Sequence, residues 1–231
     1  MEEKKWMVSV VIPNWNGKKY LRECLKSLEK QDFQNFEIIV VDNGSEDGSV
    51  DMMKKEFPRV KILRMKKNEG FCRAVNIGIR AAKSPYVLLV NNDTYAETTF
   101  VKEMLRGIRH HKNCFSCQAK MIQKAHPNLI DDAGDFYSAL GWAFAQGKGE
   151  PEEKYKKEKK IFSSCAGAAI YRKSILNKIG LFDEKHFAYL EDLDTKTGFS
   201  QRRASIMWAA ERQDRSIINL KFAIRPEIMY M

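Results

Sequence analysis

Short apolar runs alternate with longer amphipathic stretches through the first half of the chain. The short runs predict strands at 8–13 (VSVVIP), 36–42 (FEIIVVD), 60–65 (VKILRM) and 86–91 (YVLLVN). Apolar positions three or four residues apart predict helices at 17–31, 49–57, 70–83 and 100–111. Strands that alternate with helices in this way predict an α/β fold, with a mostly parallel sheet covered by helices on both faces.

The second half of the chain has a weaker pattern. Strands are predicted at 114–122 and 163–172, and Gly180 is placed to end a short helix that follows. The polar stretch between the two strands ends in residues 147–160, which we expect to form a solvated, mobile loop. Residues 196–231 show little sustained apolar period, and we expect part of the segment IMWAA or of the segment INLKFAI to dock as a short helix.

Length and composition narrow the class of protein. The chain has 231 residues, of which 44% are apolar and 30% charged, as in ordinary globular proteins. A membrane-spanning helix needs about 20 apolar residues, and no run in the sequence approaches that length. The first residues do not read as a secretory signal, and the five cysteines are an odd number. These features predict a cytoplasmic protein with reduced thiols.

The charge balance points to an anionic partner. The net charge is +10, which attracts nucleic acid, anionic lipid or a nucleoside diphosphate. Part of the excess lies in residues 54–67, but aromatic residues are not interleaved there as a base-stacking groove requires. We therefore interpret this segment as a solvated rim, and we expect no nucleic-acid partner.

Polar residues follow three of the predicted strands at the point where each one ends. The carboxyl ends of parallel strands meet at one edge of a sheet, so these side chains are expected to converge on a single crevice. Neither GxxxxGK[ST] nor GxGxxG is present, so a glycine-rich phosphate loop is not expected. A carboxylate at a strand end can instead hold a divalent cation that neutralises a diphosphate. Asp42 could also accept hydrogen bonds from a base or ribose, and each lone Asp could simply form a turn.

Five motifs, in order, carry a resemblance to a known family. They read VSVVIPNWNGKKYLRECLKSL, FEIIVVDNGSEDGS, NEGFCRAVNIGI, LLVNNDT and SCAGAAIYRKSIL…IGLFDEKHFAYLEDLD. Together they resemble the inverting family-two glycosyltransferases with a GT-A fold, in particular the rhamnosyltransferase-like branch that builds bacterial surface polysaccharide. The resemblance implies a GT-A (Rossmann-like) domain over residues 1–195. Its nucleotide-binding half covers about 6–112, its acceptor-side half about 113–195, and 196–231 form an atypical tail.

The resemblance also implies roles for individual residues. Asp93, in the segment that stands where many relatives carry DxD, becomes the ligand of Mg²⁺ or Mn²⁺. Asp192 matches the general base of the family's ED motif, with Glu191 as the second candidate. An acidic helix start is the alternative explanation of this pair. The nucleotide-binding residues are Pro13, Asn14, Asn16, Asp42, Asn68, Gly70, Arg73, Asn76 and Asn92.

The activity implied is transfer of a sugar, with inversion, from a dTDP-, UDP- or GDP-sugar to a saccharide or lipid-linked acceptor. Association with the inner face of the membrane is a further expectation. Two alternatives remain open: a sugar nucleotidyltransferase, which is also an enzyme, and a degenerate nucleotide-binding domain, which is not. The second arises because residues 196–231 depart from the family pattern just after the proposed base. On that ground we expect nucleotide binding with poor sugar transfer.

Overall fold

A nine-stranded sheet forms the centre of the computed structural model, which describes residues 5–111, 114–137, 143–187 and 217–224. Within that part of the chain, β7 (Ile130–Asp132) pairs only with β6 and the other strands form one continuous row. Their order is β3 (Lys61–Arg64), β2 (Phe36–Asp42), β1 (Val8–Asn14), β4 (Tyr86–Val90), β10 (Ala168–Arg172), β6 (Ser116–Gln123), β11 (Ile217–Ile224) and β5 (Tyr95–Ala96).

The pairing pattern confirms the mostly parallel sheet. Strands β1, β2, β3 and β4 pair in parallel, and β6 and β11 run in the same direction. Among the described strands of this sheet, β10, β5 and β7 run the opposite way. In the β1–β2 register Asn14 lies opposite Asp42, so the two strands end side by side at one edge of the sheet. This register places the first predicted site residues next to each other.

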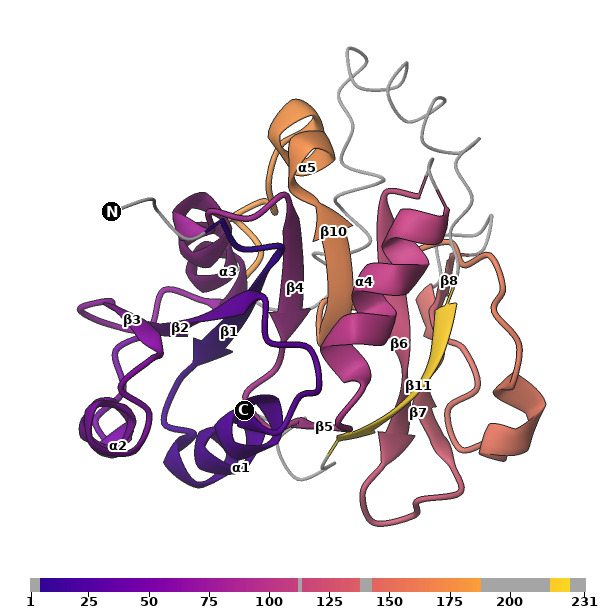
Figure 1. Cartoon of the computed structure of the whole chain (residues 1–231), viewed down its shortest axis with the longest axis horizontal. Coiled ribbons are helices and arrows are strands. Elements are labelled where there is room, and N and C mark those ends of the chain that lie inside the picture. The colour runs from indigo at the N-terminus through magenta and orange to yellow at the C-terminus, as the bar shows by residue number, and fades with distance from the viewer. Residues whose placement is uncertain (1–4, 112–113, 138–142, 188–216, 225–231) are drawn as a thin grey trace.

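Helices cover both faces of the sheet, as the alternation of elements predicts. On one face α1 (Lys18–Glu29), α2 (Ser49–Glu56) and α4 (Phe100–His110) bury their apolar sides. On the other face α3 (Phe71–Ala81) and α5 (Lys173–Ile179) do the same. Figure 1 shows α4 lying in front of β10 and β6.

The two apolar cores follow from strict alternation along the strands. On β1, Val8, Val10 and Ile12 face the α1 side, whereas Val11 faces α3, and all four are fully buried. Fully burying a side chain of this size contributes about 1.5–3 kcal/mol. A strand that is apolar on both faces belongs in the middle of a sheet, and β1 lies there between β2 and β4.

The structure refines one expectation for the second half and corrects another. Residues 147–160 form a mostly exposed loop, as expected, which contains a 3₁₀ helix, η1 (Glu152–Tyr155), and is tied to β7 by backbone bonds of 2.8 Å from Ile130 N to Glu150 O and from Gly149 N to Ile130 O. The segment INLKFAI, one of two expected to dock as a short helix, is instead part of strand β11, which joins the main sheet beyond the expected boundary at residue 195. The other segment, IMWAA, lies outside the described residues. Backbone pairing with neighbouring strands decides both the loop and β11, and the local pattern of apolar residues does not report it.

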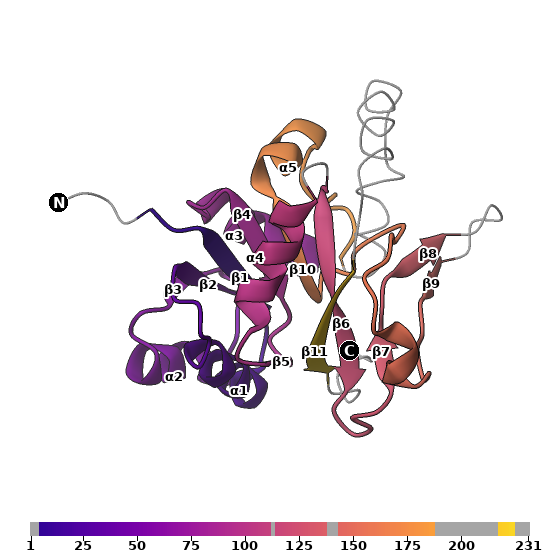
Figure 2. The same ribbon diagram turned by 45° about the vertical axis from the view of Figure 1, so that its right-hand side comes forward.

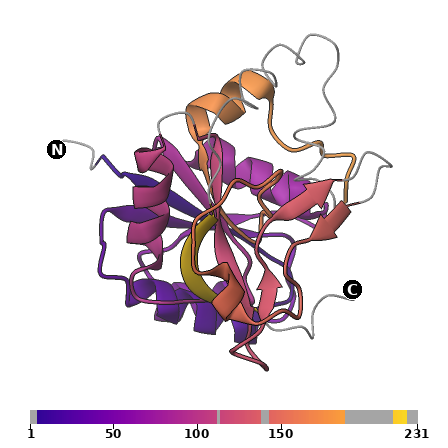
Figure 3. The same cartoon turned by 90° about the vertical axis from the view of Figure 1, so that its right-hand side faces the viewer.

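A separate hairpin stands beside the sheet. Strands β8 (Asp135–Tyr137) and β9 (Ala143–Ala145) form a two-stranded sheet of their own, and Figures 2 and 3 show them set apart from the main sheet. Phe136 and Phe144 are cross-strand partners and are 48% and 55% exposed. Within the described residues, no helix has the length and apolar content needed to cross a membrane.

Candidate functional site

The ends of β1 and β2 are joined by a buried contact between side chains. Asn14 Nδ2 donates to Asp42 Oδ1 at 3.3 Å and to Ser45 Oγ at 3.2 Å. Asp42 Oδ2 accepts from the backbone N–H of Ser45 at 3.2 Å. The Asp42 side chain is fully buried and Asn14 is 2% exposed, so this carboxylate is held in one position by hydrogen bonds.

The turn after β1 is fastened to the turn after β2. Asn16 has a positive φ of 48°, its backbone N–H donates to Ser45 Oγ at 2.9 Å, and its Oδ1 accepts from Glu46 N at 2.9 Å. Pro13 is half-buried on β1, and Trp15 projects from the same turn with 44% of its surface exposed. The sequence places Ser45 among the polar residues that follow β2, in the DNGS segment, but it did not predict a particular role for this residue.

A second polar connection links β2 to the segment that precedes α3. Asn43 Nδ2 donates to Asn68 Oδ1 at 2.8 Å and to Gly70 O at 3.1 Å, and Asn43 Oδ1 accepts from Glu69 N at 2.9 Å. Gly70 has a φ of +89° and donates its N–H to Asn68 Oδ1 at 3.0 Å. Asn68 and Gly70 therefore lie beside the end of β2, as predicted for residues of one crevice.

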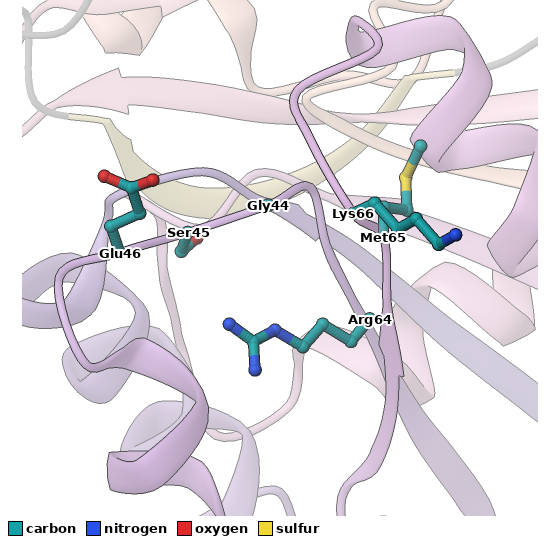
Figure 4. A pocket seen from close by; sticks show the side chains of 6 residues that line it. All are labelled: Gly44, Ser45, Glu46, Arg64, Met65 and Lys66. Atoms are coloured by element: carbon teal, nitrogen blue, oxygen red, sulfur yellow. The ribbon is translucent and has the colours of Figure 1, made fainter.

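A cavity of about 350 Å³ opens between these turns and the end of β3. Small-molecule sites typically measure about 300–1,000 Å³. Gly44, Ser45 and Glu46 form one wall and Arg64, Met65 and Lys66 the other. Figure 4 shows the Arg64 side chain reaching across the opening toward Ser45, with Lys66 pointing away. Arg64 Nε lies 3.9 Å from Asp42 Oδ2, so a side chain that lines the cavity approaches a buried carboxylate.

The residues after β4 extend the polar group and include the Asp93 carboxylate, one oxygen of which lacks a hydrogen-bond donor among the described residues. Asn92 Nδ2 donates to Asn14 Oδ1 at 2.7 Å. Asp93 Oδ1 is buried and accepts no hydrogen bond within the described part of the chain. The pKa of Asp93 is raised to about 6, mainly by burial; its own backbone N–H lowers the pKa, and the nearby Asp131 carboxylate contributes to raising it.

Asp131, on β7, is a residue that sequence reasoning missed. Burial raises its pKa as well, and Lys148 opposes that shift. A buried acidic oxygen without a donor fits a bound cation, because a cation would supply the missing charge to Asp93. Across the residues that the structure describes, no three His, Cys, Asp or Glu side chains gather as a metal site. A cation at Asp93 would therefore take most of its ligands from elsewhere, such as diphosphate oxygens.

Two predicted residues on α3 lie outside this polar group. Asn76 Nδ2 donates to Phe182 O at 2.8 Å and to Glu184 Oε1 at 3.1 Å, and its Oδ1 accepts from Phe182 N at 3.1 Å. Arg73 forms an ion pair with Glu69 at 2.7 Å. These contacts attach α3 to its neighbours. At its start, the backbone N–H of Phe71 donates to Phe187 O at 2.6 Å.

The two proposed catalytic residues, Glu191 and Asp192, lie outside the described residues. The nearest described residue before them is Phe187, whose contact with the start of α3 places the approach to the ED motif beside Gly70.

Comparison with known proteins identifies a family. The sequence profile described as "Glycosyl transferase family 2" matches residues 9–180, which is most of the chain and includes every polar residue of the group at the strand ends.

Curated relatives agree with that match. The chain is 29% identical over 186 residues to "Glycosyltransferase GlyG" of Streptococcus pneumoniae, a match that covers 79% of this chain and 60% of that protein. It is 31% identical over 120 residues to "Poly(ribitol-phosphate) beta-N-acetylglucosaminyltransferase TarS" of Staphylococcus aureus, covering 49% of this chain and 21% of that protein. The chain thus spans at most about three fifths of the length of these relatives.

Solved structures share the fold. The S. aureus TarS fragment 1–349 in complex with UDP matches with a TM-score of 0.67 and 23% identity, over 95% of this chain and 60% of that one. A GalNAc-T7 structure with UDP, GalNAc and Mn²⁺ matches with a TM-score of 0.72 and 15% identity, over 97% of this chain and 44% of that one. These likenesses confirm the GT-A-like α/β architecture. The profile match over residues 9–180 shows that this chain belongs to glycosyl transferase family 2.

Proposed function

We propose that this chain transfers a sugar, with inversion at the reacting carbon, from a nucleoside-diphosphate sugar to a saccharide or lipid-linked acceptor. The observation that carries the proposal is the hydrogen-bonded group at the ends of β1, β2 and β4. It places a buried carboxylate, Asp42, beside a cavity. Hydrogen bonds connect Asp42 to Asn14 and Asn14 to Asn92, and Asn92 is followed by a second carboxylate, Asp93.

The first carboxylate suits recognition of a nucleobase. A carboxylate only accepts hydrogen bonds, so Asp42 would select a base that offers a ring N–H donor. Uracil, thymine and guanine have such a group, which agrees with a UDP-, dTDP- or GDP-sugar donor. Two TarS structures carry UDP or UDP-GlcNAc, and on that likeness we take UDP as the first nucleotide to test.

The second carboxylate suits a divalent cation on the diphosphate. Asp93, with its buried and unpartnered Oδ1, would hold Mg²⁺ or Mn²⁺. When bound, the ion supplies charge stabilisation to the departing diphosphate. Arg64 and the positive net charge of the chain would add to the attraction of an anionic donor.

The general base is assigned to Asp192, with Glu191 as the alternative. Inversion by a single displacement needs one carboxylate that takes the proton of the acceptor hydroxyl. Asp192 lies five positions after Phe187 in the sequence, and Phe187 contacts the start of α3 beside Gly70. This closeness in sequence to a residue beside the crevice supports the assignment.

The role in surface polysaccharide synthesis, the cytoplasmic location and peripheral contact with a membrane remain parts of the proposal. They rest on the family resemblance and on the net charge of +10, which favours anionic lipid surfaces.

The test is release of nucleoside diphosphate from a panel of UDP-, dTDP- and GDP-sugars, with and without Mn²⁺, in the presence of candidate saccharide acceptors. We expect release with at least one donor, dependent on both acceptor and Mn²⁺. Nucleotide binding without release from any donor would favour the degenerate-domain alternative. Transfer of a nucleotidyl group from a nucleoside triphosphate to a sugar phosphate would instead favour the nucleotidyltransferase.

A further inference from the structure

Three side chains from three strands form one continuous hydrogen-bonded chain across the edge of the sheet. Asp42 at the end of β2 accepts from Asn14 at the end of β1, and Asn14 accepts from Asn92 after β4. We call these three residues the amide chain. Its middle member is 2% exposed, so water does not compete for its bonds.

The chemistry of the first residue fixes the direction of every bond that follows. Because the Asp42 carboxylate only accepts, Asn14 must turn its NH₂ group toward it, and that group also serves Ser45 Oγ at 3.2 Å. The carbonyl oxygen of Asn14 is then left facing residue 92. A side chain at position 92 must therefore donate a hydrogen bond, which Asn92 does at 2.7 Å.

The same reasoning fixes the orientation of Asn92, the last member of the amide chain. Asn92 uses its NH₂ group on Asn14, so its carbonyl oxygen is the atom left for a ligand. No described residue donates to that oxygen. An amide oxygen repels phosphate oxygens and is a good ligand for Mg²⁺ or Mn²⁺.

Gly17, the residue just before α1, lies against this hydrogen bond. A Cβ atom at Gly17 would lie 2.1 Å from Asn92 Nδ2 and 2.8 Å from Asn14 Oδ1. The backbone of Gly17 thus packs directly on the Asn14–Asn92 bond. A carboxylate at position 92 would face the Asn14 oxygen, and that amide could turn around only by opposing its oxygen to Asp42.

We propose that Asn14 is a positioning residue that couples the base-binding carboxylate Asp42 to the diphosphate end of the site, and that position 92 must carry a hydrogen-bond donor for this coupling. The coupling to nucleotide rests on the proposed function, whereas the donor requirement does not. A substitution at position 92 then weakens binding of the nucleobase at Asp42, although Asn14 lies between residue 92 and Asp42.

The first test measures unfolding in urea and needs no nucleotide. It compares Asn92→Asp in the natural background and in an Asn14→Ala background, because this cycle cancels the repulsion between the introduced carboxylate and Asp93. We expect Asn92→Asp to raise the unfolding equilibrium constant about tenfold more when Asn14 is present, which corresponds to ~1.4 kcal/mol of coupling. Equal effects in the two backgrounds would overturn the proposal. If Asn14→Ala does not fold, Asn14→Ser provides the second background, because a hydroxyl can donate as well as accept.

A matched variant controls for the charge change. Asn128→Asp makes the same substitution at an exposed position, and we expect it to be additive with Asn14→Ala. Coupling between positions 14 and 128 as large as that between 14 and 92 would also overturn the donor requirement.

The second test separates a positioning role from a merely structural one. UMP carries the base and a single phosphate but no diphosphate, so its affinity depends more on the Asp42 side than that of UDP does. We expect Asn92→Asp to weaken UMP binding about tenfold, and Asn92→Ser, which keeps a donor, to restore most of it. Unchanged UMP binding in Asn92→Asp would overturn the coupling. A natural chain that bound no nucleotide at all would overturn the proposed function, and the urea cycle would still decide the donor requirement.

Discussion

The site has two sides that are built in opposite ways: the base side, which holds Asn14, Asp42 and Asn43 and is proposed to bind the nucleobase, and the cation side, which holds Asp93 and Asp131. On the base side, the side chains of Asn14, Asp42 and Asn43 are buried and hydrogen-bonded to neighbouring strand ends. On the cation side, Asp93 has a buried oxygen that no described residue serves, and Asp131 adds like charge to it.

This difference separates what the fold completes by itself from what it leaves to a ligand. A hydrogen-bonded buried network is rigid and costs little to maintain, so the base side is formed before nucleotide arrives. Buried carboxylates without partners cost free energy in the absence of a cation. We infer that nucleotide binding is preorganised at the base and that a cation is needed mainly at the diphosphate.

The largest effect on sugar transfer is expected at the proposed general base, Asp192. Asp192→Asn removes the group that takes the acceptor proton and leaves both the base side and the cation side in place. Transfer should fall about 10²–10⁴-fold, and the affinity for UDP measured by calorimetry should not change. Glu191→Gln is the matched control. If Glu191→Gln abolishes transfer while Asp192→Asn remains active, the two roles are exchanged.

The rigidity of the base side can be tested with two glycines. Gly44 and Gly149 both have a φ of +78°, but a Cβ at Gly44 would lie 2.6 Å from the backbone of Lys67, whereas nothing lies within 4 Å of one at Gly149. Left-handed strain alone costs about 1–2 kcal/mol. Gly149→Ala should cost that amount in urea unfolding, and Gly44→Ala about 1–3 kcal/mol more from overlap. Equal costs would show that the turn after β2 can move away from residue 67.

Sequence reasoning was most successful where the site is carried by regular elements. The alternation of elements predicted β1 to β4 and α1 to α4 within a few residues, and the parallel sheet followed from it. The rule that strand ends converge then brought Asn14, Asp42 and Asn92 together correctly. The partners between them were not predictable, because the direction of each hydrogen bond depends on side-chain positions that spacing does not report.

The sequence was least informative beyond residue 112, where pairing between distant segments decides the structure. The segment INLKFAI, which lies in strand β11, was one of two segments expected to form a short helix. Asp131 on β7 went unnoticed because a three-residue strand has no measurable period. Asn76 carries the family motif, yet its amide is used on Phe182 and Glu184. A motif thus identified the helix correctly but did not report what that side chain binds.

The free-energy cost on the cation side can be measured with Asp93→Asn. The pKa of Asp93 is about 6 in the folded chain against 3.8 ordinarily, so the fold favours its protonated form. Stability from this group is complete below about pH 3.8 and is lost as the pH rises through about 6. Asp93→Asn should therefore be more stable than the natural chain at pH 8 without metal, by at most about 3 kcal/mol, with the gap closing toward pH 4.

The same variant should show the opposite order once ligands are present. UDP with Mn²⁺ should raise the melting temperature of the natural chain and not that of Asp93→Asn, because only the former has the carboxylate for the cation. Asp131→Asn serves as a second probe, and it should lower the pKa of Asp93 by removing a like charge. A metal-dependent shift of equal size in Asp93→Asn would remove this residue from the cation site.

The smallest effect, on folding stability, is expected at Glu184, where α3 meets the segment that precedes the proposed general base. Hydrogen bonds from Asn76 Nδ2 at 3.1 Å and Arg80 Nη2 at 3.2 Å lower the pKa of Glu184 below its ordinary 4.5, against a smaller opposing effect of burial. A depressed pKa of this kind contributes stability above about pH 4.5, and that stability is lost as the pH falls through the folded-state value. Glu184→Gln should therefore be slightly less stable than the natural chain at pH 7 and equal to it near pH 3.

Urea unfolding at several pH values measures this difference, and Glu29→Gln, at an exposed position on α1, is the control for the loss of one carboxylate charge. The Glu184 contacts join α3 to the segment before the proposed base without touching Asn14 or Asp42. If the attachment of that segment is independent of the base side, Glu184→Gln should slow transfer and leave UDP affinity unchanged. A loss of UDP affinity in this variant would mean that the base side depends on the second half of the chain after all.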